Sequence, residues 1–520
     1  MKRREMLKSL LSAQLVAAKA GSQGTKPKRL VWPPPVKRTD GGEMPNILWI
    51  CSDQQRYDTL EGVNNPYIHT PNLRKLTEQS VTFTHAFVQN PVCSPSRASF
   101  LTGRYPHTTG LRANGQKIRA TERLVTRMLA DYGYECGLVG KLHLSPGLEG
   151  RTEERIDDGY DLFWWSWSPW AGRPETNQYF LWLASKGVKV PQKTEIPIVP
   201  GMELRNGPYG YPIDPKFTQT AWCADTAIEF INTHGTLSPW LFSVNWFSPH
   251  HPFAPPKEFY DRYDPAKLPS PPYREGELET KSVYQRVDHE ASTGGRSVSF
   301  KRTDDLTHRK ITAAYYAMIE EVDFHVGRIL KALEESGQAD NTIVIFQSDH
   351  GEMMGDHGIY LKGPHFYEGA VRIPFIIRWP GRYKAGLKSD ALVEMVDVVP
   401  TLLEACGIPV PQGVQGKSLT ALLKGETTTH RDSIYSEYYD SAAPYDPPPM
   451  VTMVRTATHK LIYYHSLEFA ELYNLDKDPG EINNIWSSPE ARDARDRVTV
   501  KMINRMAETV DPLPIRLGEG

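Results

Sequence analysis

The most constraining feature of this sequence is a series of short apolar runs from Asn46 onward, separated by longer stretches with helical periodicity. Each run is followed by polar, Pro or Gly residues, which mark the end of a buried strand. This alternation is typical of strands joined by crossover helices, so it predicts an α/β fold: a large mixed, mostly parallel sheet sandwiched by helices. The expected strands lie at 46–51, 135–139, 240–247, 342–347 and 374–379.

The clearest helix is expected from 311 to about 336, where apolar residues recur with helical spacing before Gly337. Another should begin at Thr70-Pro71, a capping residue followed by a proline at the first helical position. By contrast, 254–308 is polar, Pro-rich and without clear periodicity. We expect it to be a surface excursion or a substrate-side loop.

The pattern divides the chain into an N-terminal segment, a main domain and a C-terminal subdomain. Residues 1–44 are interpreted as an export signal and a Pro-rich linker, and 45–425 as the α/β domain. In 426–520 the strands expected at 434–438, 450–456 and 460–464 indicate a small antiparallel sheet, because a tight connection separates the last two.

The N-terminus begins with Lys2-Arg3-Arg4, continues with a modest apolar stretch and offers the small-residue pattern Ala18-Lys19-Ala20. It resembles a twin-arginine export signal, which predicts a periplasmic or secreted protein. The alternative is a basic, frayed tail. No other segment approaches the roughly 20 apolar residues of a membrane span, so none is expected.

Charge and cysteine content argue against a nucleic-acid partner, a disulfide framework and a CxxC zinc site. With 520 residues and a formal net charge of -2, the chain offers a large core but no excess of basic residues, so no nucleic-acid partner is expected. Its five cysteines are widely spaced and odd in number, which indicates neither a disulfide framework nor a CxxC zinc site. They are Cys51, Cys93, Cys136, Cys223 and Cys406.

Oxygen-rich sequences follow two of the expected strands. Asp53 and Gln54 come after the first strand, and Asp349 and His350 come after the strand at 342–347. Ligand sites of open α/β sheets lie at the carboxyl ends of strands, and a hard cation such as Ca²⁺ prefers several oxygen ligands. Each Asp alone would more often cap a turn, but the pairing favours a metal site.

Cys93 is expected at the N-terminus of a helix, because Pro95 stands near the start of an apolar helical run. Free backbone N–H groups and the helix dipole favour an anion there, and Arg97 adds a fork suited to an oxyanion. On this reasoning Cys93 is either a thiolate nucleophile of lowered pKa or a buried structural cysteine.

The segment Cys93-Ser94-Pro95-Ser96-Arg97 resembles the Cys-x-Pro-x-Arg signature of the sulfatase family, formylglycine-dependent enzymes of the alkaline-phosphatase-like superfamily. The likeness extends over most of 45–485 in the family's order and spacing, and implies a sulfuric ester hydrolase. Its further matches are Leu101-Thr102-Gly103, Thr70-Pro71-Asn72-Leu73, Gly140-Lys141-Leu142-His143, Pro249-His250-His251-Pro252-Phe253, Lys362 before Tyr367-Glu368, Arg372-Ile373-Pro374, and Glu471-Leu472-Tyr473-Asn474-Leu475 with Asp478-Pro479.

The resemblance implies that a dedicated maturation enzyme oxidises Cys93 to Cα-formylglycine, whose hydrated aldehyde is the nucleophile. It places Asp53, Gln54, Asp349 and His350 on the family's metal-ligand positions, with the modified Cys93 beside the metal. Many members have Asp and Asn where Gln54 and His350 stand, so His350 alternatively hydrogen-bonds the nucleophile or the sulfate. We expect one Ca²⁺, with other divalent metals left open by a nitrogen ligand.

The resemblance also implies roles for Arg97, Lys141, His143, His250 and Lys362. One hydroxyl of the hydrated aldehyde attacks sulfur, the three cationic residues balance the sulfuryl charge, and His250 or Lys362 protonates the leaving alcohol. His143 deprotonates the second hydroxyl, so that C–O cleavage expels sulfate and restores the aldehyde. Lys141 and His143 are two residues apart, and on an extended backbone they would face the same side.

The nearest alternative is a phosphonate monoester or phosphodiester hydrolase of the same superfamily. Asp53-Gln54-Gln55-Arg56 is compatible with that branch. Its members, however, tend to lack the Lys-x-His pair that Lys141 and His143 form here. The sequence therefore favours the sulfatase.

A second alternative, from another class, is a non-catalytic carbohydrate-binding relative. Its sugar-stacking platform would be Trp164, Trp165, Trp167 and Trp170, although such clusters more often pack beneath a loop. We expect the substrate to be a sulfated glycan or a sulfated small molecule, with a sulfated sugar first and an aryl or alkyl sulfate left open. Loops in 144–220 and 254–308 should set specificity, and no oligomeric state is indicated.

Overall fold

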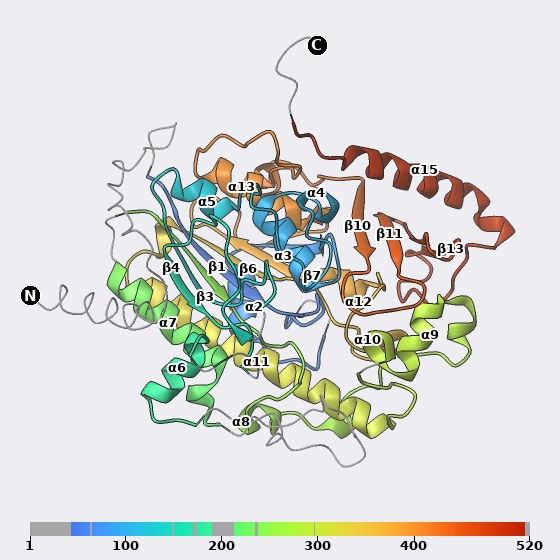
Figure 1. The fold of residues 1–520 in the computed structure, drawn as a ribbon, viewed down its shortest axis with the longest axis horizontal. Coiled ribbons are helices and arrows are strands. Elements are labelled where there is room, and N and C mark those ends of the chain that lie inside the picture. The colour runs from blue at the N-terminus through green and yellow to red at the C-terminus, as the bar shows by residue number, and fades with distance from the viewer. Residues whose placement is uncertain are drawn as a thin grey trace, which may run out of the picture.

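The computed structural model describes residues 43–514 except 63–64, 148–149, 170–172, 174, 190–212, 235–237 and 296. Within these residues a nine-stranded sheet runs through the molecule, with the order β4-β3-β5-β1-β6-β7-β2-β8 and with β9 paired to β2 (Figure 1). Its strands are β1 (Asn46–Ser52), β2 (Val81–Phe87), β3 (Glu135–Gly140), β4 (Leu162–Trp165), β5 (Trp240–Asn245), β6 (Thr342–Ser348), β7 (Arg372–Arg378), β8 (Leu387–Ser389) and β9 (Val393–Glu394).

The described helices cover both faces of this sheet (Figure 1). They are α2 (Pro71–Glu78), α3 (Cys93–Thr102), α4 (Pro106–Thr109), α5 (Val125–Ala130), α6 (Gln178–Ser185), α7 (Gln219–His234), α8 (Lys257–Tyr260), α9 (Val283–Glu290), α10 (Ser292–Gly295), α11 (Asp305–Glu335), α12 (Glu368–Val371), α13 (Val398–Ala405), α14 (Thr420–Lys424) and α15 (Arg492–Glu508).

The predicted fold class is confirmed, including the mixed character of the sheet. Strands β4, β3, β5, β1 and β6 are parallel neighbours. Strand β7 runs antiparallel to both β6 and β2, although its apolar run looks like the others in sequence. Direction is decided by the connection that precedes a strand, which an apolar run does not reveal.

Alternating side chains of the central strand β1 enter two separate cores. Ile47 and Trp49 pack in a core that includes residues of α3, α5 and α13. Leu48 and Ile50 pack in a core that includes residues of α7 and α11. Successive strand residues point to opposite faces, so a strand that is apolar at every position is buried on both sides.

The C-terminal region forms a second, four-stranded sheet in the order β10-β11-β12-β13. Its strands β10 (Ser433–Tyr439), β11 (Met450–Thr456), β12 (His459–Tyr464) and β13 (Phe469–Asn474) are antiparallel neighbours. One face contributes Met453 and Ile462 to the main core, and the other packs against Val498 and Met502 of α15. This confirms the small antiparallel sheet, with β13 as a strand the pattern did not indicate.

Residues 254–308 were expected to be a surface excursion or a substrate-side loop, and the first of these alternatives was wrong. The segment contains α8, α9 and α10, and α9 is tied into the fold (Figure 1). Tyr284 is 1% exposed and packs in the main core, while Asp288 is buried beside His365. The polar composition reflects buried hydrogen bonding, which hydrophobic periodicity does not detect.

The predicted helix at 311–336 is confirmed as α11, which begins earlier, at Asp305. The side chain of Asp304 accepts a hydrogen bond from the backbone N–H of Thr307 at 2.8 Å, so it caps the first turn. The predicted start at Pro71 is also confirmed by α2.

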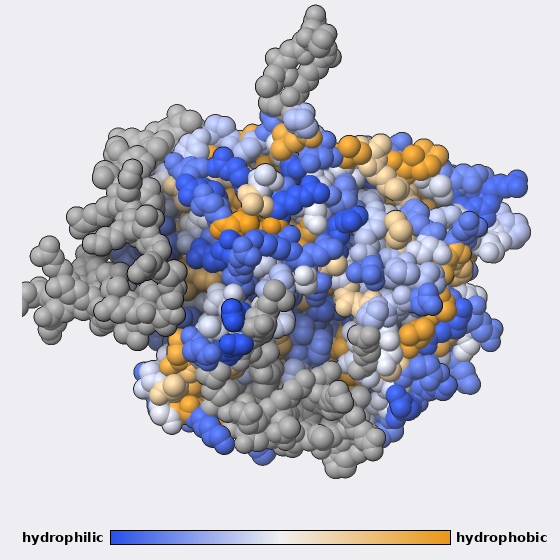
Figure 2. Space-filling model, viewed as in Figure 1, coloured by the Kyte–Doolittle hydropathy of each residue, from blue (hydrophilic) through white to orange (hydrophobic). Residues whose placement is uncertain are grey.

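Polar residues cover most of the face shown in Figure 2, and apolar residues gather along α15. Exposed apolar residues of this helix include Val500 and Ile503, at 56% and 59%. Among the described residues no helix is long and apolar enough to cross a bilayer. The expected export signal lies almost entirely in residues 1–42, outside the described part.

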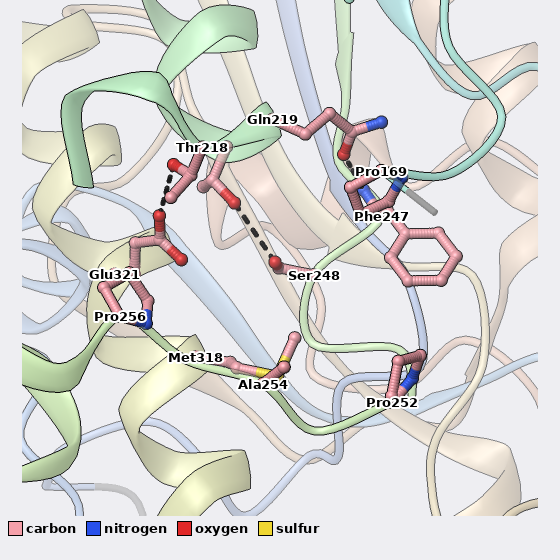
Figure 3. A pocket seen from close by; sticks show the side chains of 11 residues that line it. Pro169, Thr218, Gln219, Phe247, Ser248, Pro252, Ala254, Pro256, Met318 and Glu321 are labelled. Carbon is pink, nitrogen blue, oxygen red and sulfur yellow. Dashed lines mark hydrogen bonds between the residues drawn. The ribbon is translucent and has the colours of Figure 1, made fainter. Parts of the chain in front are cut away.

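A small pocket lies where α7 and α11 approach the loop after β5 (Figure 3). On its wall, Thr218 Oγ1 donates a hydrogen bond of 2.6 Å to Glu321 Oε1, and Thr220 Oγ1 lies 3.1 Å from Ser248 Oγ. Burial raises the pKa of the Glu321 carboxyl to about 8. Neutral Glu321 is therefore the stable form in the folded protein near pH 7.

We expect Glu321→Gln to stabilise the protein at high pH. Unfolded Glu ionises near pH 4.5, whereas folded Glu321 ionises near pH 8, so the folded state binds more protons between these values. The stability due to the protonated carboxyl is complete below pH 4.5 and is lost as pH rises through 8. The neutral amide of the variant avoids this loss of unfolding free energy. The loss amounts to about 1.4 kcal/mol for each unit by which folding raises the pKa.

Urea unfolding at pH 5 and pH 9 measures this effect. The variant should exceed the wild type in unfolding free energy by a small amount at pH 5 and by a few kcal/mol at pH 9. The difference at pH 9 is on the order of 1.4 kcal/mol for each unit by which the pKa of Glu321 is raised. Glu335→Gln, at an exposed position of the same helix, is the control. An equal effect of Glu321→Gln at both pH values would contradict a raised pKa.

Candidate active site

Two acidic loops meet where β1 and β6 end. These strands pair in parallel with Ser52 opposite Ser348, so Asp53 and Asp349 leave the sheet side by side. The backbone N–H of Gln54 donates to Asp349 Oδ1 at 3.0 Å, which joins the two loops. The carboxyl ends of neighbouring parallel strands thus bring together the residues that the sequence predicted for a metal site.

Cys93, the first residue of α3, lies directly against these loops. Its Sγ is 3.1 Å from His350 Nε2 and 3.8 Å from Asp53 Oδ1. Asp53, Cys93, Asp349 and His350 each present a ligand atom, and these atoms all lie within 4.8 Å of one another. All four residues are buried, so the cluster is sheltered from bulk water.

Three cationic side chains balance the buried carboxylates. Arg97 Nε is 2.8 Å from Asp349 Oδ2, and its Nη2 is 3.5 Å from Asp53 Oδ2. Lys141 forms an ion pair with Asp53. Lys362 Nζ lies 3.0 Å from Cys93 Sγ. Buried charges are tolerated only when they are paired, which accounts for this density of opposite charge.

Two histidines approach the same sulfur atom. His143, in the loop after β3, and His250, in the loop after β5, lie close enough to the Cys93 side chain for it to oppose the lowering of each ring's pKa by burial, in addition to the contact of His350. His250 Nδ1 donates to the carbonyl oxygen of His251 at 2.6 Å, which leaves Nε2 for the site. The structure therefore brings together every site residue that the sequence predicted.

The electrostatics of the site favour an anion at Cys93. Burial by itself raises the pKa of the Cys93 thiol, but Lys141, Lys362 and His350 outweigh it and hold that pKa well below its usual value. Burial and Cys93 raise the pKa of Asp53, yet Lys141 and other cations lower it to about 2. Burial, followed by Lys141, lowers the pKa of His143 to about 4, so His143 is a neutral base.

The donor set suits a divalent cation. Lys362 Nζ lies 2.9 Å from Gln54 Oε1, 3.0 Å from Cys93 Sγ and 3.0 Å from His350 Nε2. These acceptor atoms converge on a positive charge beside the carboxylates of Asp53 and Asp349. Carboxylate and amide oxygens with one imidazole nitrogen match the ligand chemistry of hard and borderline divalent metals.

The expected reason for the pairing of Lys141 with His143 was wrong. Strand β3 ends at Gly140, which has φ +100°, and His143 itself has φ +65°. The backbone between them is therefore not extended. Lys141 reaches Asp53 and His143 reaches Cys93 because the loop turns, which depends on contacts distant in sequence.

Sequence reasoning missed the carboxylates that hold the site loops. Glu153 Oε1 accepts the backbone N–H of His143 at 2.8 Å, and Oε2 accepts that of Leu144 at 3.1 Å. Glu352 accepts a hydrogen bond from the side chain of Gln54. Glu352 lies three residues after Asp349, so its position could have indicated a role at the site. The sequence offers no such signal for Glu153.

The described tryptophans do not form one exposed platform. Trp164 and Trp165 are neighbours on β4 and therefore point to opposite faces; Trp165 is 2% exposed and Trp164 packs near Phe242. Among the described tryptophans, only Trp167 lies against the ring of a predicted site residue. Its ring centroid is 5.7 Å from that of His143. Trp170 lies outside the described residues.

A buried cysteine, two histidines of lowered pKa (His143 and His250) and a metal-type donor set at the end of a mostly parallel sheet suit a hydrolytic enzyme with an α/β fold. Two family models match the chain: Sulfatase over residues 45–408, and N-sulphoglucosamine sulphohydrolase, C-terminal, over residues 355–509. The chain belongs to the sulfatase family, and it is an enzyme that hydrolyses sulfate esters.

Two similar relatives are sulfatases, whereas a similar solved structure is a phosphonate monoester hydrolase. An arylsulfatase of Clostridium perfringens is 30% identical over 482 residues, which cover 89% of this chain and 94% of that protein. An N-acetylglucosamine-6-O-sulfatase of Bacteroides thetaiotaomicron is 26% identical over 504 residues, covering 86% and 83%. The solved phosphonate monoester hydrolase of Silicibacter pomeroyi is 25% identical, with a TM-score of 0.78 and coverage of 90% and 96%.

We expect Arg97→Leu to destabilise the folded protein strongly when metal is removed with EDTA. The substitution takes the guanidinium from two buried carboxylates and leaves their charge with less compensation. Loss of one partner of a buried ion pair costs about 3–5 kcal/mol of unfolding free energy. Urea unfolding of the wild type and the variant measures the difference.

Arg74→Leu is the matched control, because Arg74 pairs with Glu61 and Glu78 at an exposed position. Exposed ion pairs contribute about 0–1 kcal/mol, so the control should change little. A loss of similar size in both variants would contradict the importance of the buried pairs.

Proposed function

We propose that this sulfatase removes sulfate from a carbohydrate, using a formylglycine made from Cys93 next to one calcium ion. The observation that carries the proposal is the environment of Cys93: three histidines, a lysine and a buried carboxylate all reach its side chain. A structural cysteine requires no such partners, whereas a nucleophile does. Partners that accept and donate protons suit a residue bearing two hydroxyl groups.

The hydrated aldehyde at position 93 would use its neighbours for different proton transfers. His143, neutral because its pKa is about 4, is suited to take the proton of the hydroxyl that does not attack sulfur. His250, with Nδ1–H held by a carbonyl oxygen, has a proton-free Nε2 in the site; it would take the proton of the attacking hydroxyl there and pass it to the leaving alcohol, and the ammonium of Lys362 is the alternative donor. After the alcohol has left, breakage of the C–O bond releases sulfate and restores the aldehyde.

Asp53, Gln54, Asp349 and His350 would hold the calcium ion, with the modified residue 93 beside it. When bound, the ion supplies positive charge that favours the ionised hydroxyl and the sulfate oxygens. Lys141 and Lys362 lie where they add to this charge. Arg97, bonded to Asp349, acts mainly by keeping the carboxylates ionised and oriented.

A carbohydrate substrate is supported by the relative named N-acetylglucosamine-6-O-sulfatase. A free sulfated sugar or a sulfated glycan is the class we propose. The proposed modification requires a formylglycine-generating maturation enzyme as a partner. The twin-arginine-like N-terminus supports export to the periplasm or the exterior.

A phosphonate monoester hydrolase is the second candidate, because a solved enzyme of that name shares the fold at a TM-score of 0.78. Turnover of an aryl sulfate, an aryl phosphonate monoester and an aryl phosphodiester separates the two. We expect kcat/KM to be highest for the sulfate. A higher value for either phosphorus ester would overturn the sulfatase assignment.

We expect Cys93→Ala to abolish turnover, and Cys93→Ser to do so unless the maturation enzyme accepts serine. In the wild type, mass spectrometry of the peptide carrying residue 93 should show a mass below that of the encoded thiol, or the hydrated form. The control is Cys406→Ala, because Cys406 is buried beside Tyr134, which bonds the carbonyl oxygen of Pro45 just before β1 begins, whereas the site lies where β1 ends; its activity should remain.

Full activity of Cys93→Ala would overturn the assignment of the nucleophile. An unmodified thiol in fully active enzyme would overturn formylglycine while leaving the sulfatase family in place. For the metal, EDTA should remove activity and added Ca²⁺ should restore it. If only another divalent metal restored activity, the assignment of the ion as calcium would be overturned.

A further inference from the structure

Glu352 stands immediately behind one of the candidate metal ligands. It lies in the loop after β6 and is 0% exposed. Its Oε2 accepts a short hydrogen bond from Gln54 Nε2. Its Oε1 accepts the backbone N–H groups of Met354, at 3.0 Å, and Leu361, at 2.5 Å. Both oxygens of this buried carboxylate therefore accept hydrogen bonds.

The carboxylate determines which end of the Gln54 amide faces the site. An amide side chain has a donor end, NH₂, and an acceptor end, C=O, and an ionised carboxylate only accepts hydrogen bonds. Glu352 therefore takes the donor end. The acceptor end, Oε1, is left to face Lys362 Nζ at 2.9 Å, on the cation side.

The same carboxylate also holds the chain next to Lys362. Leu361, whose N–H it accepts, has φ +64°, a left-handed conformation that a branched side chain adopts only when its surroundings impose it. Glu352 thus links the loop that carries Lys362 to the loop that carries Gln54.

We propose that Glu352 is the positioning residue that turns the oxygen of Gln54 toward the metal. The inference rests on the proposed metal site. A glutamine carries no charge, so its contribution to cation binding depends on presenting oxygen rather than nitrogen. Glu352 enforces this orientation from directly behind the ligand, as outer carboxylates do at other metal sites.

The test is calcium affinity, measured by isothermal titration calorimetry on purified protein and checked by the calcium-dependent shift in melting temperature. In Glu352→Gln, an NH₂ group meets the NH₂ of Gln54 whenever Oε1 of residue 352 keeps its two backbone donors. Gln54 must then flip or lose its partner. We expect calcium affinity to fall about 10- to 100-fold, the range for loss of outer-shell partners.

The exchanged pair Gln54→Glu with Glu352→Gln keeps the donors and acceptors between residues 54 and 352, and those of Met354 and Leu361, matched. The amide at 352 accepts from Met354 and Leu361 and donates to the new carboxylate at 54, whose other oxygen faces the cation. Calcium affinity should return at least to the wild-type level. Because the exchange restores the hydrogen bonds between residues 54 and 352 and to the backbone of Met354 and Leu361, this variant tests the inference even where the single variant folds poorly.

The matched control is Glu321→Gln, another buried Glu that hydrogen-bonds Thr218 and none of the candidate ligands. Its calcium affinity should equal that of the wild type. Unchanged affinity in Glu352→Gln, or no recovery in the exchanged pair, would overturn the inference alone. Failure of the wild type to bind calcium would overturn the proposed metal, and the inference with it.

Discussion

The pairing of two buried carboxylates with buried cations is the interaction on which the rest of the site depends. Asp53 and Asp349 are 0% exposed, and neither charge would be tolerated there without Arg97 and Lys141. This requirement brings α3 and the loop after β3 to the ends of β1 and β6. Cys93, at the start of α3, is placed against the acidic loops as a consequence.

The C-terminal sheet is joined to this region by a second set of buried ion pairs. Lys460 of β12 lies 2.8 Å from Glu368 Oε1 and 2.7 Å from Glu481 Oε1, and Arg455 of β11 also reaches Glu368. Glu368 begins α12, shortly after Lys362. The smaller sheet therefore supports the chain that delivers Lys362 to the site, in addition to closing one side of the main core.

Much of the fold was predictable because buried parallel strands are recognisable locally. The run beginning at Asn46 is apolar on both faces, and the runs that form β3, β5, β6 and β7 were identified in the same way, whereas the short run of β4 was not. Strand β2 was missed because Thr82, Thr84 and His85 interrupt its apolar pattern, and β8 and β9 because each is three residues long or shorter. The polar stretch before α11 was misjudged, since its buried residues are held by hydrogen bonds.

By itself the sequence determined the class of fold, the family and the identity of the chemical groups, because strand periodicity and the Cys93 motif are local properties. Only the tertiary structure decided how these groups act on one another. The loop carrying His143 turns against Glu153, and Gln54 presents its oxygen because Glu352 takes its nitrogen. These orientations depend on partners brought close by folding, and a short-range hydrogen bond between distant segments leaves no periodic trace in the sequence.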